Sequence, residues 1–328
     1  MPQIMKQIAG LIVILAALNA SAGKLGEPVV FTGTCDASAA LGVTGDLFVV
    51  ANDEDSLLRF YRFSQPGPPL QTFDLKPWFS NKRKNPEADL EAAAPLGDTI
   101  FFITSHGRNS AGKPAPARQR LFALKLTETN SSVTVQRVGE LYTNLVADLA
   151  ADSRYAPFDL GEASELAPKA SGGFNIEALV ATPEGTLLIG FRNPIPHGRA
   201  LLAPLLNPRE IIEGRPAKFG APLQLDLGGL GLRDMCITTN GYYLIAGPAH
   251  GGHGESRLFS WSGASATPQA ISEVHFAKSN PEGICFLDFG NHTDFLIVSD
   301  DGSRKINGKE CKSLPEAQRQ FRAYRYTP

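Results

Sequence analysis

Five oxygen-bearing side chains begin similar segments of the sequence: Ser38, Glu91, Glu177, Asp234 and Glu282. In each segment a short apolar run follows, then a turn containing Gly or Asn, a stronger apolar run and a polar loop. Carboxylates gathered in a narrow space would raise one another's pKa values, and a shared divalent cation would remove this conflict. Because oxygen ligands favour calcium over zinc, the pattern predicts a calcium site.

The same five residues allow a structural alternative. Short polar side chains at the start of a strand often bond to nearby backbone groups. Each side chain would then accept hydrogen bonds from backbone amides of the next repeat and join neighbouring units without a metal.

The polar loops that follow the stronger apolar runs carry candidate groups for chemistry at the same site. The guanidinium group of arginine binds phosphate oxygens through two parallel hydrogen bonds, and histidine transfers protons near neutral pH. Asp53 and Asp300 are further candidate bases. The alternative for each loop residue is a solvated surface group. We predict catalytic roles for His106, Arg108 and His250, and substrate-binding roles for Arg192, His197, Arg199 and His253.

The elements that position these residues form a repeat. The five segments recur at roughly 50 residues, and each of the first four continues into two further strand-like runs, as in the blades of a β-propeller. The longer interval between Glu91 and Glu177 holds a partly helical insertion around residues 141–173. We therefore predict an all-β, five-bladed propeller, with six blades or a β-sandwich as alternatives. The first strand of each blade lines the central channel, which would gather the five side chains at one mouth.

The two ends of the repeat predict how the ring closes. The fifth copy ends after its third strand, Phe321–Tyr326, and lacks a fourth. The segment from Pro28 to Gly33 precedes the first copy and has the composition of a strand. It would complete the last blade and remove the exposed sheet edges.

The composition excludes several classes of protein. The chain has 328 residues, with 31 Lys and Arg against 33 Asp and Glu, and this balance argues against a nucleic-acid binder. A hydrophobic content of 43% argues against disorder. The 32 Gly and 24 Pro are spread without a short period, which excludes collagen and indicates many turns.

The N-terminus predicts export. Lys6 precedes an apolar run from Ile8 to Leu18, and Ala20-Ser21-Ala22 is typical of a cleavage site. Residues 1–22 would be a signal peptide and 23–328 a single propeller domain, secreted or periplasmic. A retained membrane anchor is the alternative, although the run is shorter than the roughly 20 residues of a spanning helix. The four cysteines allow three disulfide pairings or unpaired thiols. They are Cys35, Cys236, Cys285 and Cys311.

Two resemblances follow from these motifs. The five side chains resemble the one-ligand-per-blade calcium site of the soluble calcium-dependent apyrases, five-bladed propellers that hydrolyse nucleoside diphosphates and triphosphates. Asp234 departs from that family, which tends to have a hydroxyl there. The whole chain after residue 22 more closely resembles a bacterial family catalogued as domain of unknown function 3616, which implies a propeller-like fold. That resemblance rests on DLEAAAPLGDTIFFITSHGR, FNIEALVATPEGTLLIGFRNP, GLRDMCITTNGYYLIAGP and NPEGICFLD.

Related patterns also occur in esterase-like phytases and lactonase-type propellers. The sequence therefore predicts an exported calcium-binding propeller that hydrolyses a phosphoester or phosphoanhydride. Its partner would be a small-molecule, phosphate-containing ligand, with no nucleic acid or membrane partner. The alternatives are a non-catalytic propeller with structural calcium that binds a ligand or a protein, and a lactonase-type ester hydrolase. The substrate and the oligomeric state stay open.

Overall fold

The computed structural model describes residues 23–328 except 80–86, 130–131, 251–253, 277 and 291–293. The predicted signal peptide and His253 lie outside the described residues.

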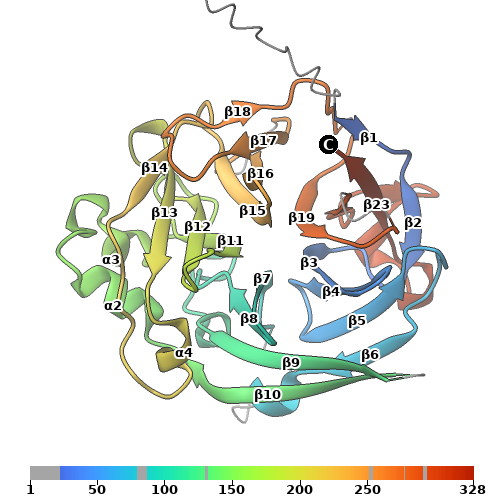
Figure 1. The fold of residues 1–328 in the computed structure, drawn as a ribbon, viewed down its shortest axis with the longest axis horizontal. Helices are drawn as coiled ribbons and strands as arrows, with labels where there is room; N and C mark the ends of the chain where they lie inside the picture. The colour runs from blue at the N-terminus through green and yellow to red at the C-terminus, as the bar shows by residue number, and fades with distance from the viewer. Residues whose placement is uncertain (1–22, 80–86, 130–131, 251–253, 277, 291–293) are drawn as a thin grey trace, which may run out of the picture.

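Five antiparallel sheets surround a central channel, as Figure 1 shows, which confirms the five-bladed β-propeller. The first blade comprises β3 (Ala37–Thr44), β4 (Leu47–Asn52), β5 (Leu57–Arg62) and β6 (Gln71–Asp74). The second comprises β7 (Leu90–Leu96), β8 (Thr99–Thr104), β9 (Leu121–Thr129) and β10 (Ser132–Tyr142). The third comprises β11 (Asn175–Ala181), β12 (Leu187–Asn193), β13 (Ala200–Leu205) and β14 (Leu223–Leu225). The fourth comprises β15 (Gly231–Thr238), β16 (Gly241–Gly247), β17 (Arg257–Trp261) and β18 (Gln269–Ala270).

The fifth blade combines strands from both ends of the chain. Its inner strands are β19 (Pro281–Phe286) and β20 (Phe295–Ser299), followed by β23 (Gln320–Thr327). Beside β23 lie β2 (Val29–Thr32) and β1 (Lys24–Leu25), both antiparallel to it. The predicted closure of the ring by the N-terminal strand is confirmed (Figure 1).

Helical segments are short and lie outside the blades. The predicted insertion contains α2 (Leu145–Ala151) and α3 (Leu160–Ala163), at the periphery of the molecule in Figure 1. The other α-helices are α1 (Lys76–Phe79) and α4 (Pro208–Ile211). A small hairpin of β21 (Lys305–Ile306) and β22 (Lys309–Glu310) follows β20 and precedes β23 in the sequence. Among the residues described, no helix is long and apolar enough to span a membrane.

The hydrophobic core is divided among the interfaces between blades. Apolar residues of neighbouring sheets form one buried cluster at each interface. Between blades 5 and 1, Phe31 of the closing strand stacks on Phe321 and meets Phe48 edge to face. This burial seals the ring in addition to the hydrogen bonds of the closing strand.

One disulfide, Cys35–Cys311, links the residue before Asp36 to the segment that follows the small hairpin. Cys236 and Cys285 are buried free thiols. Of the pairings that the sequence left open, the structure thus selects one bridge and two unpaired cysteines.

Candidate functional site

A β-bulge places one residue of each inner strand at the channel. In every blade the pairing advances by two residues on the inner strand and by one on its neighbour, as between Leu90 and Ala92 in β7. The side chain of the residue that the bulge leaves unpaired points in a different direction from that in a regular strand. We call these five residues the channel ring; they are Ser38, Glu91, Glu177, Arg233 and Glu282.

The ring corrects the sequence-based assignment in blade 4. Asp234 was predicted as the ring member, but it pairs regularly with Ile245, and Arg233 has the bulge position. The Oδ2 atom of Asp234 accepts a hydrogen bond from the backbone N–H of Ile284 at 2.8 Å, across the interface with blade 5. Burial raises the pKa of Asp234 well above its usual range. This residue is the inter-blade connection that the structural alternative described.

Arg233 carries positive charge into the ring. Its Nη1 atom lies 2.5 Å from Glu177 Oε2, and its Nη2 atom lies 2.7 Å from Glu282 Oε1. Arg192 Nη1 lies 2.8 Å from the other oxygen of Glu177. Burial alone would raise the pKa of Glu177, but the two guanidinium groups outweigh it and lower that pKa. Both oxygens of Glu177 are therefore already paired.

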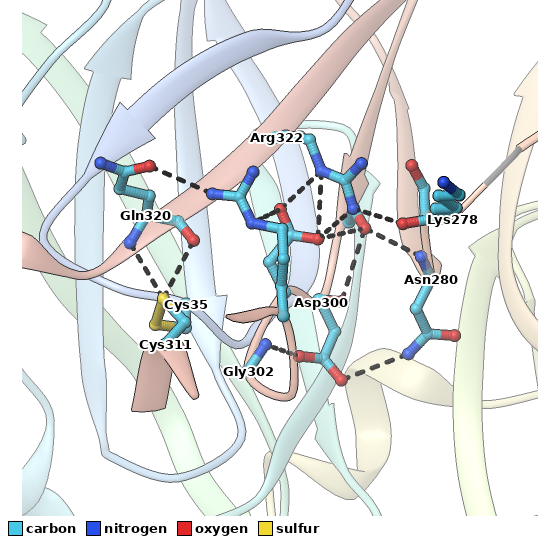
Figure 2. Close-up of polar contacts among 12 residues, drawn as sticks. Cys35, Lys278, Asn280, Asp300, Gly302, Cys311, Gln320 and Arg322 are labelled. Carbon is cyan, nitrogen blue, oxygen red and sulfur yellow. Dashed lines mark hydrogen bonds and ion pairs between the residues drawn. A yellow bond between two sulfur atoms is a disulfide. The ribbon is translucent and has the colours of Figure 1, made fainter. Parts of the chain in front are cut away.

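The polar network continues into blade 5. Asn280 Nδ2 donates to Glu282 Oε1 at 2.8 Å and to Asp300 Oδ2 at 3.2 Å. Figure 2 shows Asp300 between this amide and the backbone N–H of Gly302, which donates to Asp300 Oδ1 at 2.8 Å. Burial raises the pKa of Asp300 to about 6 and that of Glu282 to about 7, although Arg233 opposes both shifts.

On the opposite side of the ring, acceptor oxygens lack partners. Glu91 is 8% exposed and makes no hydrogen bond or ion pair with any residue that the structure describes. Ser38 Oγ, Asp53 Oδ1 and Asn175 Oδ1 are buried and have no hydrogen-bond partner in the described part of the chain. Burial and neighbouring carboxylates raise the pKa values of Glu91 and Asp53 well above their usual range. These four residues, which we call the open side, come from blades 1, 2 and 3.

Both sides of the ring face one cavity of about 490 Å³. Arg118 pairs with Asp89 at 2.8 Å on the cavity wall, and burial raises the pKa of Asp89 to about 6 despite this pair. Lys169 and Lys312 also line the cavity. The acidic lining residues include Asp53, Asp89, Glu91, Glu177, Glu282 and Asp300.

The structure disperses most of the predicted loop residues. Arg192 lines the cavity. His106 is buried, with Nδ1 2.8 Å from Thr104 O, and burial lowers its pKa to about 4. Arg108 donates to Ser164 O and pairs with Glu165 of the insertion. His197 and Arg199 are exposed, and His250 is half-buried; with His106 and Arg108, they lie outside the lining of this cavity.

Sequence reasoning missed Arg233 and Asn175. It aligned the repeats by their acidic residues, although a buried apolar residue precedes every ring member. In blade 4 the apolar residue is Leu232, which would have identified Arg233 as its successor. The other preceding residues are Ala37, Leu90, Ile176 and Pro281.

Among the described residues, no group of three His, Cys, Asp or Glu side chains is placed to hold a metal ion. The open side differs from such a group, because two of its four oxygens belong to Ser38 and Asn175. Any cation here would be held by mixed oxygen ligands, and not by a cluster of carboxylates alone.

Comparisons with known proteins identify a family for the chain. A family model described as "Protein of unknown function (DUF3616)" matches residues 111–311. No curated protein matches the chain. Among solved structures, the glutaminyl cyclase of Myxococcus xanthus is 10% identical, with 93% of this chain and 96% of that chain covered and a TM-score of 0.46. The PQQ-bound aldose sugar dehydrogenase of Streptomyces coelicolor is 10% identical, with 93% and 98% covered and a TM-score of 0.48. These likenesses carry no function over to this chain.

Proposed function

The chain belongs to the DUF3616 family of proteins of unknown function, and we propose that it is a calcium-binding propeller whose channel mouth receives a small-molecule ligand. The single observation that carries this proposal is the open side. Among the described residues, Ser38 Oγ, Asp53 Oδ1 and Asn175 Oδ1 lack a hydrogen-bond partner, and Glu91, Asp53 and Asn175 line one cavity.

The chemistry of the open side suits calcium. An unsatisfied buried polar group costs about 1–3 kcal/mol, and a bound cation would offset this cost at several groups together. Glu91, Asp53, Asn175 and Ser38 offer oxygen only, which calcium accepts from carboxylates, amides and hydroxyls. Glu91 and Ser38 belong to the predicted ligand set. Glu177 and Glu282 already pair with Arg233, and Asp234 faces the blade interface.

A cavity of about 490 Å³ exceeds the space that one ion occupies. Lys169 and Lys312 also line its wall, and Lys312 Nζ lies 3.8 Å from Glu54 Oε1. Bound calcium together with these ammonium groups would attract an anion, which supports a phosphate-containing ligand. Calcium, when bound, would supply a Lewis acid that polarises oxygen atoms of such a ligand.

Hydrolysis of a phosphoester or phosphoanhydride is the second candidate function. The supporting observation is a set of cavity carboxyls with pKa values near neutrality, namely Glu282 at about 7, Asp300 at about 6 and Asp89 at about 6. Groups with such pKa values suit general acid and base catalysis. They would replace His106, Arg108 and His250 in that role. A lactonase-type ester hydrolase would use the same groups.

Export stays part of the proposal. The predicted signal peptide lies outside the described residues, and its support is the Cys35–Cys311 disulfide. Disulfides form and persist mainly in oxidising compartments such as the periplasm.

Isothermal titration of calcium into the chain lacking residues 1–22 tests the proposal. We expect one bound ion and at least a tenfold weaker affinity in Glu91→Gln. Asp234→Asn is the matched control, because its carboxylate faces another blade, and its affinity should equal that of the parent. Absence of binding heat, with no metal in elemental analysis of the purified protein, would refute the calcium site.

A further inference from the structure

Arg233 departs from the chemistry of the channel ring. The bulge position holds an oxygen-bearing side chain in four blades and a guanidinium group in blade 4. Arg233 is 5% exposed, so this charge is removed from bulk water. A buried charge persists only when it is paired and hydrogen-bonded.

The partners of Arg233 come from the blades on either side. Glu177 belongs to β11 of blade 3, and Glu282 belongs to β19 of blade 5. Their oxygens lie 2.5 Å and 2.7 Å from the Arg233 nitrogens, and Asn280 Oδ1 accepts a further hydrogen bond at 3.1 Å. The guanidinium therefore lies between two ring carboxylates that a metal ion would otherwise neutralise.

We propose that Arg233 is the resident counter-ion of the channel mouth and substitutes for a divalent cation between Glu177 and Glu282. On the proposed function, exchangeable cations occupy the open side, whereas the opposite side holds the fixed side-chain cation of Arg233. Arg233 thus determines how many metal ions the channel mouth binds.

Removal of the Arg233 guanidinium group would leave the two carboxylates without their shared partner. Without Arg233, the partner that Glu282 keeps among the described residues is the Asn280 amide, and Glu177 keeps Arg192 and the Asn175 amide. Two carboxylates would then face each other across the vacated space. A calcium ion supplies the missing charge, and water completes its coordination.

Arg233→Ser tests this inference, since it gives blade 4 the hydroxyl that Ser38 gives blade 1. Titration calorimetry should show one more calcium ion per chain than in the wild type, whether the wild type binds one or none. Calcium should also raise the melting temperature of Arg233→Ser by more degrees than that of the wild type.

Two further variants control for trivial effects. Arg233→Lys keeps the charge and should bind no additional ion. The triple variant Arg233→Ser, Glu177→Gln, Glu282→Gln removes the carboxylates and should lose the additional ion.

Wild-type binding tests the proposed function, whereas the difference between Arg233→Ser and the wild type tests this inference. Equal stoichiometry and equal calcium dependence of melting would overturn it. An Arg233→Ser chain that fails to fold at every calcium concentration would also overturn it, because calcium would then not substitute for the guanidinium.

Discussion

The Nη1 atom of Arg233 lies 2.5 Å from Oε2 of Glu177, and both side chains are 5% exposed. This ion pair joins the inner strands of blades 3 and 4 at the channel. Because water is largely excluded from it, the pair should contribute to stability differently from the ion pairs on the surface.

We expect Glu177→Gln to lower the free energy of unfolding by about 3–5 kcal/mol, because two buried guanidinium groups lose their common carboxylate. Urea denaturation measures this change. Asp98→Asn is the control, since it removes an exposed pair with Lys125 and should lower the free energy of unfolding far less. Equal midpoints for the two variants would contradict the stabilising role of the buried pair.

The effect of Glu91→Gln should change sign with calcium. In chelator we expect the variant to be more stable than the wild type by about 1 kcal/mol, because repulsion among the carboxylates falls. In saturating calcium the order should reverse, since a ligand that binds the native state stabilises it by mass action. Thermal melting under both conditions measures the crossover. A variant that is less stable under both conditions would argue against an unpaired Glu91.

His106 should make the protein sensitive to acid. Burial lowers its pKa from 6.5 to about 4, so the unfolded chain binds more protons between these values. The contribution of the neutral His106 ring to the free energy of unfolding is fully present above pH 6.5. It is lost as the pH drops toward 4, and the loss is about 3 kcal/mol.

His106→Asn removes the titrating ring, and asparagine tolerates the positive φ of 55° at this position. The loss of unfolding free energy between pH 7 and pH 4 should be about 3 kcal/mol smaller in this variant than in the wild type. Denaturant titrations at both pH values measure it. Parallel pH profiles would show that His106 is not buried in the neutral form.

The disulfide should be the most effective single covalent restraint. It joins residues 276 positions apart, and cross-links that close long loops restrict the unfolded chain strongly. Replacing Cys35 and Cys311 by alanine should cost about 4 kcal/mol in guanidinium denaturation. Cys236→Ala, which removes an unpaired buried thiol, should retain the disulfide and shift the midpoint less. A larger shift for Cys236→Ala than for the double variant would contradict this ranking.

The sequence was sufficient for the fold and for most of the ring. Apolar runs and turns predicted five blades, the closing strand and the helical insertion, because period-two patterning and turn residues act locally. The predicted position of the ring residue in blade 4 was wrong by one residue. A bulge adds one residue to a strand without changing its composition, so Arg233 and Asp234 exchange places when only acidic residues are aligned.

The loop residues show a different limit. His106 and Arg108 follow β8, as expected from the repeat. Their side chains nevertheless lie outside the lining of the cavity. His106 contacts Thr104, and Arg108 contacts the insertion, because the surrounding structure decides where a loop side chain points. Composition and spacing alone hold no information on those contacts.

The pairing of β2 with β23 makes one blade depend on contacts between distant parts of the chain. These strands lie at opposite ends of the described residues, so their contact has nearly the largest sequence separation available. Contacts of this kind form late, because the loop-closure entropy is lost before any pairing compensates for it. Four of the five blades draw their strands from one continuous segment each, whereas the fifth needs strands from both ends of the described chain, so its completion costs the most loop-closure entropy.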